Sequence, residues 1–357
     1  MTRLVVAVAS AGLTALTFMA CAADVRLGDL ATTDSGTTPA DAPTLDAAAE
    51  VDAPDTDAAC DCKGNPCSAG RCLPLVLSPG GSDPVYLTAD AANLYYATNG
   101  HAGTPADPNR VYRVAKSGGA PTPLNEDGGF VRGIVVDDTL VYWVRSFGTS
   151  GSVGCASKVD GSSRRLIGGF GGTVDVRDLE GDSDDLFLTS ITQVRNYKKS
   201  ATGSPGTQVT NLLSSAAGLV VDGTSLFVAD TTAGSVAEVS RISGTTTTKA
   251  SPLDAPTLVA SDATHLYVAG NGFVSRVAKT GSVIEPVVTP LGAVGDLALD
   301  PTTVYFSTSS IIAKVAKGST SATTLVSNLT AGASLVVDDD FVYFADRGSG
   351  AISRIPK

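Results

Sequence analysis

The sequence predicts an all-β protein, and three observations lead to this prediction. The chain of 357 residues contains 38 glycines, which supply the backbone conformations that tight turns between short strands need. Runs with the apolar spacing of an amphipathic helix are few. A short segment also recurs along the chain: an aliphatic run, then an aspartate, then an aliphatic residue followed directly by an aromatic one.

The recurring segment occurs seven times, and its copies align on one aspartate. Each copy has an aliphatic residue three positions before this anchor aspartate, another four positions after it, and an aromatic residue next. Successive anchors lie 47, 45, 40, 40, 38 and 38 residues apart. Strand-rich repeats of about 40 residues predict a β-propeller. The anchors are Asp90, Asp137, Asp182, Asp222, Asp262, Asp300 and Asp338.

Each copy predicts the inner part of one propeller blade. The aliphatic run forms a short first strand, and the anchor aspartate makes a structural turn by accepting hydrogen bonds from nearby backbone N–H groups. The aliphatic-aromatic pair, such as Leu94 and Tyr95, opens the second strand, in which adjacent side chains point to opposite faces. Both faces must therefore be buried, as they are in a blade that lies between two others.

The outer strands of each blade have weaker signals. A fourth strand is predicted at 165–167 and 286–288, for example, where aliphatic residues cluster again. A third strand is predicted where a cation precedes Val or Ile, at Arg113-Val114, Lys158-Val159, Arg241-Ile242, Arg276-Val277, Lys314-Val315 and Arg354-Ile355.

The seventh copy is predicted to be completed by the beginning of the chain. Its third strand runs to the last residue, whereas residues 73–78 form an apolar run that belongs to no copy. We expect this run to pair with blade seven and close the ring, which removes the open seam of the propeller. The copy around Asp182 is the weakest, so six blades with one degenerate copy is the alternative to seven.

The repeat resembles the NHL and YWTD propeller repeats. Their first two strands combine a glycine, an aliphatic run, an aspartate and an aliphatic-aromatic pair, and the segments 218–230, 133–144 and 335–346 are most similar to this pattern. The resemblance covers residues 79–357 and implies a β-propeller. The chain departs from those families in having seven copies where they often have six.

The first 21 residues predict a lipoprotein signal peptide. Arg3 precedes an apolar run over 4–19, which is shorter than the roughly 20 residues of a membrane span. The run ends in Phe-Met-Ala-Cys at 18–21, which resembles the lipobox of bacterial lipoproteins, although that family usually has Leu in place of Phe18. The resemblance implies acylation of Cys21 and a lipid anchor in the bacterial envelope, with the outer membrane or cell surface favoured. Secretion after plain cleavage is the alternative.

The next segment, 22–59, predicts a disordered acidic linker. It consists mainly of Ala, Asp, Thr and Pro, with nine acids and one base. Such a segment buries too little apolar surface to offset the entropy of ordering it. Residues 60–357 account for only −4 of the net charge of −11, because the linker contributes −8 and Arg3 contributes +1. The propeller at 73–357 is therefore nearly neutral.

Four of the six cysteines lie within residues 60–72 and predict a small disulfide-stapled segment. Zinc is the alternative, but an exported chain meets an oxidising compartment, which favours disulfides. Three pairings are open. We favour Cys60 with Cys67 and Cys62 with Cys72, because bridging cysteines separated by one residue is strained. Cys155 is predicted to be a small buried core residue.

The sequence argues against several kinds of chemistry. A net charge of −11 argues against a nucleic-acid binder with a basic stripe. The two histidines, His101 and His265, are predicted on opposite faces, which argues against a His triad or metal cluster. The acidic cluster at 175–185 lacks the ligand spacing of an EF-hand loop and predicts a solvated turn. We therefore predict no cofactor and no metal.

Candidate binding residues gather on one predicted face. In other propellers, ligands meet the face that carries the loops between blades and between second and third strands. The starts of the innermost strands place Arg132, Arg177, Asp178 and Asp296 at the channel mouth on this face. Its loops contribute His101, Asp107, Arg110, Arg145, Asp230, Asp346 and Arg347.

These features predict a monomeric, non-catalytic propeller that is tethered to the membrane by its lipid anchor and binds a protein or glycan partner at the cell envelope. One alternative is a propeller enzyme, a hydrolase of the lactonase type, with its site at the channel mouth. The five glutamates count against that alternative, because none is predicted at the start of an innermost strand. The other alternative is a purely structural envelope lipoprotein.

Overall fold

The computed structural model describes residues 60–78, 81, 83–99, 109–125, 128–148, 150–171, 175–289 and 292–357. The predicted signal peptide with Cys21, the predicted linker, His101 and Asp107 lie outside the described residues. Secondary structure within the described ranges consists of 30 strands. None of these ranges contains a helix with the length and apolarity needed to cross a membrane.

Twenty-eight of the strands form seven antiparallel sheets of four, and we name these sheets blades 1 to 7. Blade 1 comprises β4 (Pro84–Ala89), β5 (Asn93–Thr98), β6 (Arg110–Ala115) and β7 (Thr122–Pro123). Blade 2 comprises β8 (Phe130–Val136), β9 (Leu140–Ser146), β10 (Ser150–Ser157) and β11 (Arg165–Gly171). Blade 3 comprises β12 (Val176–Gly181), β13 (Asp185–Ser190), β14 (Gln193–Lys198) and β15 (Thr207–Thr210). Blade 4 comprises β16 (Ala216–Asp222), β17 (Ser225–Asp230), β18 (Ser235–Ser240) and β19 (Thr246–Ala250).

The remaining blades have the same strand order. Blade 5 comprises β20 (Leu258–Ser261), β21 (His265–Ala269), β22 (Val274–Ala278) and β23 (Ile284–Val288). Blade 6 comprises β24 (Val294–Leu299), β25 (Thr303–Thr308), β26 (Ile312–Ala316) and β27 (Ala322–Val326). Blade 7 comprises β28 (Ala333–Val337), β29 (Phe341–Asp346), β30 (Ala351–Pro356) and β3 (Leu75–Ser78). The two short strands β1 (Cys67–Ser68) and β2 (Arg71–Cys72) form a separate hairpin.

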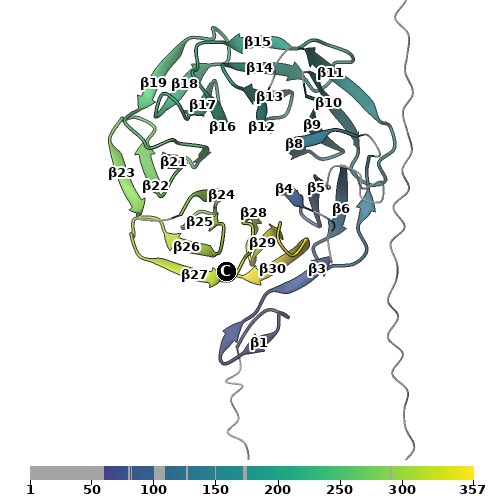
Figure 1. Ribbon diagram of the computed structural model, residues 1–357, viewed down its shortest axis with the longest axis vertical. Helices are drawn as coiled ribbons and strands as arrows, with labels where there is room; N and C mark the ends of the chain where they lie inside the picture. The colour runs from purple at the N-terminus through teal and green to yellow at the C-terminus, as the bar shows by residue number, and fades with distance from the viewer. Residues whose placement is uncertain are drawn as a thin grey trace, which may run out of the picture. The chain divides into compact units, whose positions relative to one another are not determined.

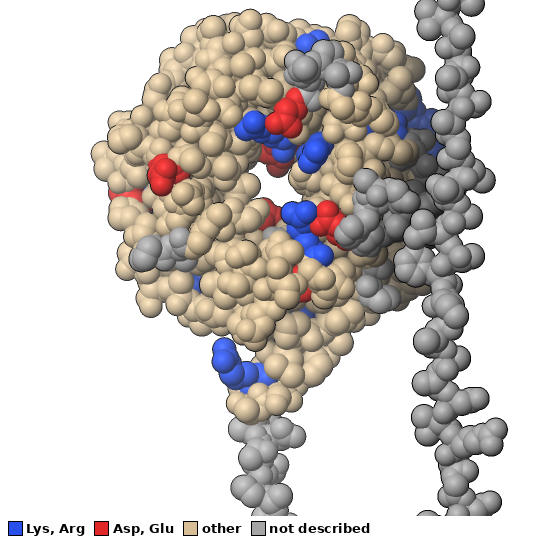
Figure 2. Space-filling model, viewed as in Figure 1, with Lys and Arg blue, Asp and Glu red and all other residues tan. Residues whose placement is uncertain are grey.

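The seven blades are arranged in a ring (Figure 1), and the space-filling view shows the opening of a channel at its centre (Figure 2). The first strand of every blade lies innermost and contacts the first strands of the blades before and after it, including β28 against β4. The prediction of a seven-bladed propeller is therefore confirmed. The alternative with six blades is wrong, because the weakest copy, around Asp182, forms the complete four-stranded blade 3.

Blade 7 is built from both ends of the described chain, as predicted. Its outermost strand, β3, pairs antiparallel with β30, with Leu75 opposite Arg354 and Val76 opposite Ser353. The core lies between the blades, since each hydrophobic cluster combines residues of neighbouring sheets. Leu94 and Tyr95 point to opposite faces of blade 1, and both have 0% relative exposure.

The anchor aspartates cap the turns between first and second strands. In blade 2, one oxygen of Asp137 accepts hydrogen bonds from the backbone N–H groups of Thr139 (3.0 Å) and Leu140 (2.9 Å). The other oxygen accepts a hydrogen bond from the hydroxyl of Tyr142 at 2.8 Å and contacts the Lys199 ammonium of blade 3 at 3.2 Å. One carboxylate therefore fixes its own turn, the aromatic ring of its own second strand, and the next blade.

An ion pair of this kind occurs at every boundary between blades. The cation is always the residue directly after the third strand of one blade, and the carboxylate is the anchor of the blade before it. The pairs are Lys158–Asp90, Lys199–Asp137, Arg241–Asp182, Lys279–Asp222, Lys317–Asp262, Lys357–Asp300 and Lys116–Asp338. The last pair joins blade 1 to blade 7, so the seven pairs form a closed series.

Two of the third-strand predictions are wrong by a few residues. Strand β10 ends at Ser157 and β18 ends at Ser240, so Lys158-Val159 and Arg241-Ile242 lie in the turns that follow. Their Val and Ile side chains are exposed. The physical reason is that these two cations serve the ion pairs just described, so each has to stand beyond the end of its strand.

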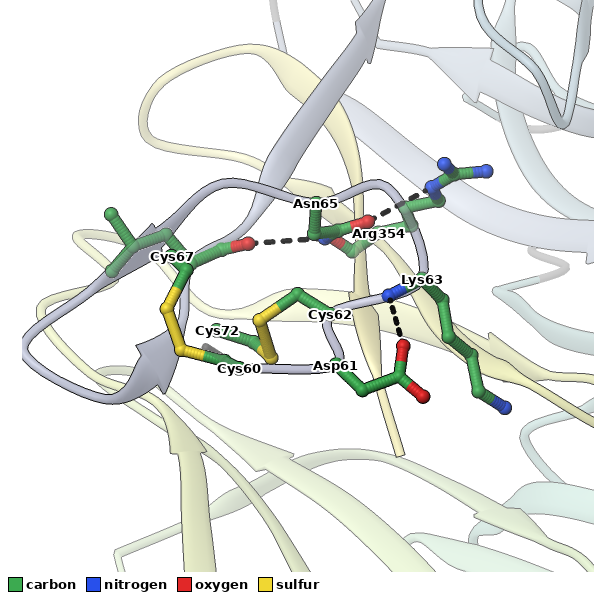
Figure 3. The surroundings of a disulfide bond; sticks show 9 residues. Cys60, Asp61, Cys62, Lys63, Asn65, Cys67, Cys72 and Arg354 are labelled. Atoms are coloured by element: carbon green, nitrogen blue, oxygen red, sulfur yellow. Dashed lines mark hydrogen bonds between the residues drawn. A yellow bond between two sulfur atoms is a disulfide. The ribbon is translucent and has the colours of Figure 1, made fainter. Parts of the chain in front are cut away.

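The cysteine-rich segment is fastened to blade 7 (Figure 3). Disulfides join Cys60 to Cys67 and Cys62 to Cys72, which is the pairing that the sequence favours. Between these cysteines, the Asn65 side-chain amide donates hydrogen bonds to the backbone carbonyls of Leu73 (3.0 Å) and Arg354 (2.9 Å). One side chain thereby connects the chain leading into β3 with β30. Cys155 is buried and unpaired.

Shortening the buried side chain of Leu77 in β3 should lower the stability of the propeller. Leu77 has 5% relative exposure, whereas Val76, its neighbour in the same strand, has 55%. We expect Leu77→Ala to reduce the free energy of unfolding by about 2–5 kcal/mol and Val76→Ala to change it by less than about 0.5 kcal/mol. Denaturant unfolding followed by tryptophan fluorescence measures both values. Equal losses in the two variants would show that β3 does not close the core.

The series of ion pairs should make the propeller sensitive to acid. Burial alone would raise the pKa of Asp137, but hydrogen bonds from Leu140, Thr139 and Tyr142 and the Lys199 ammonium lower it to about 2. The pKa values of Asp262 and Asp300 are also lowered. Because these folded-state values lie below the unfolded value of about 3.9, the resulting stability is present above that pH and is lost as pH falls toward 2.

One cation tests this contribution. We expect Lys317→Met to cost about 1–3 kcal/mol at pH 7 and to flatten the decline in stability between about pH 5 and pH 2. Lys314→Met is the matched control, since Lys314 lies in β26, three residues before Lys317, and is outside the series of ion pairs. Unfolding midpoints across this pH range provide the measurement. Identical pH profiles for wild type and Lys317→Met would contradict the assignment.

Candidate functional site

A cavity of about 540 Å³ opens at one mouth of the central channel. It lies on the face where first strands begin and second strands end, since β12 and β24 contribute their second and third residues to it. In the view of Figure 2, Lys, Arg, Asp and Glu side chains gather around the central opening. Within the described chain, this cavity combines the innermost strands of blades 1 and 3 to 7.

One sequence position shapes the inside of this cavity. Four residues before each anchor, the side chain points toward the first strand of the next blade. In blade 3 this residue is Asp178, whose carboxylate accepts hydrogen bonds from the N–H of Leu179 (2.9 Å) and from the N–H of Leu219 in blade 4 (2.8 Å). The residues at this position are Tyr86, Gly133, Asp178, Gly218, Leu258, Asp296 and Ser334.

The same contact recurs in blade 6. Asp296 accepts hydrogen bonds from Leu297 N–H (2.7 Å), from Leu335 N–H (2.8 Å) and from the Ser334 hydroxyl (2.8 Å). Where the position is glycine, the next blade comes too close for any side chain. A Cβ at Gly133 would meet the Leu179 Cβ at 2.6 Å. Polar side chains at this position therefore stand only where the blades leave room for them.

Tyr86 occupies this position in blade 1 with a strained backbone. Its φ angle is 52°, in the left-handed region that bulky residues rarely adopt. The pairing of β4 with β5 shifts its register around this residue, so the strand bulges. Tyr86 lines the cavity. Burial raises the pKa of its hydroxyl, and the neighbouring Arg132 opposes this rise. Strain of this kind concentrates at binding and active sites.

Three carboxyl groups meet in the cavity, on Asp178, Glu180 and Asp296. Burial raises the pKa of Asp178 to about 6, against the hydrogen bonds from Leu219 and Leu179. Burial, together with the negative charge of Asp178, raises the pKa of Glu180 to about 8. Burial also raises the pKa of Asp296. The site therefore carries closely spaced acids whose charges repel one another, and Glu180 is mostly protonated at pH 7.

The arginines at the mouth are paired with acids of the rim. Arg177 contacts Asp175 at 3.2 Å and donates a hydrogen bond to the Ser215 hydroxyl at 2.9 Å. Arg347 donates two hydrogen bonds to Asp83, at 2.6 and 3.1 Å. Within the part of the chain that the structure describes, no cation forms an ion pair with the three carboxyl groups of the cavity. The centre of the mouth is thus acidic, and Asp175 and Asp83 neutralise two of the arginines around it.

The structure brings together some of the candidate binding residues and separates others. Four line the cavity: Arg177, Asp178, Asp296 and Arg347. Arg132 lies next to the cavity, beside Tyr86. Arg110 lies at the start of β6, away from the cavity lining. Arg145 packs over the ring of Phe147, away from the cavity.

Two candidates instead hold backbone loops. Asp230 is buried and accepts hydrogen bonds from the N–H groups of Ser214 and Ser215 at 2.7 and 2.8 Å. Asp346 caps its own turn by accepting hydrogen bonds from Gly348 N–H and the Ser349 hydroxyl. Both carboxylates already accept hydrogen bonds within the protein. Their positions in the sequence do not reveal these contacts.

Sequence reasoning missed two residues of the cavity, Tyr86 and Glu180. A signal for Glu180 was present, since it stands two residues after Asp178 in a strand and therefore on the same face. The prediction that the whole acidic run at 175–185 forms a solvated turn is correct only for the turn at 182–184, because Asp178 and Glu180 lie in β12 and Asp185 is a buried residue of β13. Asp182 in the turn and Asp185 at the start of β13 both contact Arg241.

The described residues offer one cluster with the geometry of a metal site. Its sulfur atoms belong to Cys60, Cys62 and Cys67, which are already joined in disulfides. The three carboxyl groups of the cavity do not bring their oxygens within 4.8 Å of one another as a set.

No family model matches the chain, and the search of curated proteins also finds no match. Solved propellers do resemble it. Inactive virginiamycin B lyase from Staphylococcus aureus, crystallised with quinupristin, is 12% identical over 80% of this chain and 98% of its own, with a TM-score of 0.62. The WD40 β-propeller domain of Doa1 is 15% identical over 79% and 95%, with a TM-score of 0.63. At these identities the likeness shows the fold alone, and the resemblance to NHL and YWTD repeats stays a prediction.

Replacement of Glu180 tests the electrostatics of the cavity. The folded-state pKa of this acid lies above its unfolded value of about 4.3, so the folded state binds the proton more tightly, and wild-type stability falls as pH rises from about 5 to 8. Glu180→Gln removes this penalty. We expect the variant to be more stable than wild type by more than ~1 kcal/mol at pH 9 and by less at pH 5. Glu285→Gln, in the outer strand β23, should show no such trend.

Proposed function

We propose that the protein is an exported, lipid-anchored β-propeller that binds a polar partner, a protein or a glycan, at the mouth of its channel and does not catalyse a reaction. The observation that carries this proposal is the cavity in which Asp178, Glu180 and Asp296 stand without a cationic partner among the described residues. A ligand that donates hydrogen bonds or carries positive charge would satisfy these groups.

Binding is favoured over catalysis by the way the two aspartates are used. Both oxygens of Asp178 and of Asp296 accept backbone N–H groups, which connect neighbouring blades. Acid–base catalysis on a substrate needs a positioned acid and a positioned base that can exchange protons. Glu180 is the one carboxyl group of the three that is not committed to the neighbouring blade through a hydrogen bond described above.

An enzyme is the second candidate, and one observation favours it. Glu180, with a pKa raised to about 8, would be a protonated acid inside a cavity at neutral pH, which is the state that a general acid needs. One of the structural neighbours is a lyase that was crystallised with quinupristin. Turnover of quinupristin that is lost in Glu180→Gln would establish this candidate and overturn the non-catalytic assignment.

The binding proposal is tested with arrays of glycans and of peptides. We expect a ligand on one of these arrays to lose about tenfold or more of its affinity in the double variant Glu180→Gln, Arg347→Gln, because both side chains line the cavity. Glu285→Gln combined with Arg276→Gln is the matched control, since these two residues form an ion pair away from the cavity. Ligands that bind both double variants as well as wild type would move the site elsewhere.

The lipid anchor is tested separately, because Cys21 lies outside the described residues. We expect intact-mass analysis of the membrane-bound protein to give the mass of a chain that begins with acylated Cys21, less four hydrogens for two disulfides. Two signals hold a protein more firmly than one acyl chain, so a multiply acylated form should stay membrane-bound. Cys21→Ser should release the protein from the membrane fraction. An unmodified wild-type protein in the medium would indicate plain secretion.

A further inference from the structure

A second cavity, of about 460 Å³, lies between blades 3 and 4, which are neighbours in the ring (Figure 1). One side of it is formed by β13, β14 and β15 of blade 3, and the other by the turns at 223–224 and 241–244 of blade 4. These turns follow first and third strands, whereas the channel mouth lies where first strands begin. The cavity is therefore on the opposite side of the propeller from the mouth, and we call it the blade 3–4 groove.

The blade 3–4 groove is open because two side chains of blade 3 are short. The third-strand residue that pairs with the second-strand aromatic residue points to the same face as the ring. In blade 3 it is Asn196, opposite Phe187, and its fourth-strand partner is Thr207. In each other blade, at least one of these two positions holds a longer side chain, which can fill the space. The pairs there are Arg113 with Thr122, Cys155 with Arg165, Glu238 with Thr247, Arg276 with Glu285, Lys314 with Thr323 and Arg354 with Leu75.

The charged groups at the blade 3–4 groove neutralise one another. Lys198 contacts Asp185 at 2.8 Å. Arg241 contacts Asp182, and it also lies 3.4 Å from Asp185. Its guanidinium group stands over the Phe187 ring at 4.7 Å, which holds it against blade 3. Two cations are thus balanced by two carboxylates, and the groove has no excess charge with which to attract a charged ligand.

The hydrogen-bonding groups that remain free in the blade 3–4 groove are neutral. The side chains of Asn196, Thr207, Gln208 and Thr224 line the groove and form no hydrogen bond within the part of the chain that the structure describes. Amide and hydroxyl groups each both donate and accept hydrogen bonds. Ile242 also lines the groove, and its side chain is 87% exposed. The groove therefore combines neutral polar groups with an apolar contact.

We propose that the blade 3–4 groove binds a neutral oligosaccharide. A sugar ring carries several hydroxyl groups, which donate and accept hydrogen bonds, on a framework that also presents C–H groups. The hydroxyl groups satisfy the amides of Asn196 and Gln208 and the two threonine hydroxyls, while C–H groups rest on Ile242. The groove volume falls within the range of roughly 300–1,000 Å³ that ligand sites occupy. This site is separate from the channel mouth and does not depend on the function proposed for the mouth.

The experiment uses the linear trimers of glucose, galactose, mannose, xylose and N-acetylglucosamine as probes. Saturation-transfer NMR detects binding, and calorimetric titration measures the dissociation constant. We expect at least one trimer to bind at millimolar concentration or below. Its affinity should change little with salt concentration, because the ligand carries no charge that salt can screen. If none of the trimers binds at millimolar concentration, the assignment of a neutral oligosaccharide is wrong.

One variant locates the bound sugar. Asn196→Arg gives blade 3 the long side chain that Arg276 supplies at the same position of blade 5. We expect this variant to lose about tenfold or more of its affinity for the trimer. Thr323→Arg is the matched control, since Thr323 occupies the position in blade 6 that Thr207 occupies in blade 3, and it should bind as wild type does. A trimer that binds Asn196→Arg as tightly as wild type lies elsewhere on the protein, and this result would overturn the assignment.

Two smaller changes test single contacts and keep the experiment decisive if Asn196→Arg does not fold. Gln208→Ala and Ile242→Ser alter exposed side chains, so both variants should fold. We expect each to weaken binding about two- to tenfold, as the loss of one hydrogen bond or one apolar contact does. Val283→Ser is the control for Ile242→Ser, because Val283 is 72% exposed and lies in the corresponding turn of blade 5. Unchanged affinity in both groove variants, or an equal loss in Val283→Ser, would contradict the assignment.

Discussion

The ion pair between an anchor aspartate and the cation of the next blade is the interaction on which the rest of the structure depends. The carboxylate at Asp137 shows how much one group does: it caps a turn, binds the Tyr142 hydroxyl and contacts Lys199 of the following blade. Because the same contact recurs at all seven boundaries, each blade fixes the angle of its neighbour. In repeat proteins, stability is the sum of unit and nearest-neighbour contributions. Here the series of neighbouring contacts has no end, because Lys116 of blade 1 pairs with Asp338 of blade 7.

The candidate site arises where the repeat departs from regularity. At the position four residues before each anchor, glycine lets the first strands of adjacent blades approach closely, as at Gly133 and Gly218. Aspartate at this position replaces that close contact with hydrogen bonds and leaves a carboxyl group in the channel mouth. Tyr86 departs further, because it accepts a strained backbone in order to place an aromatic ring there. The turn at the anchor aspartate, which is the same in every blade, thus builds the scaffold. The position four residues before the anchor differs between blades and supplies the polar groups of the site.

The fold was predictable because its signal is periodic. Seven aspartates with an aliphatic residue and an aromatic residue at fixed distances define the blades even though no single copy is convincing alone. The cation after each third strand also occurs in all seven copies, but its spacing from the anchor varies with the loops, and sequence reasoning therefore placed Lys158 and Arg241 inside strands. The site was predictable only in part. Strand starts indicated Asp178 and Asp296, whereas the hydrogen bonds by which Asp230 and Asp346 hold backbone loops depend on loop geometry that a sequence does not state.

The composite blade 7 sets the order in which the molecule can be completed. Strand β3 lies near the beginning of the described chain and its partner β30 near the end. The Asn65 amide therefore cannot bind the Arg354 carbonyl, 289 residues away, until β30 has been made. Until the two strands pair, each presents an unpaired edge, which is a place where chains aggregate. Contacts this distant in sequence also slow folding. The two disulfides span only 7 and 10 residues, and they can shape the segment before its docking place exists. The disulfide-bonded segment at 60–72 can thus take its shape early, and the last strand, β30, then docks against the strand β3 that follows it.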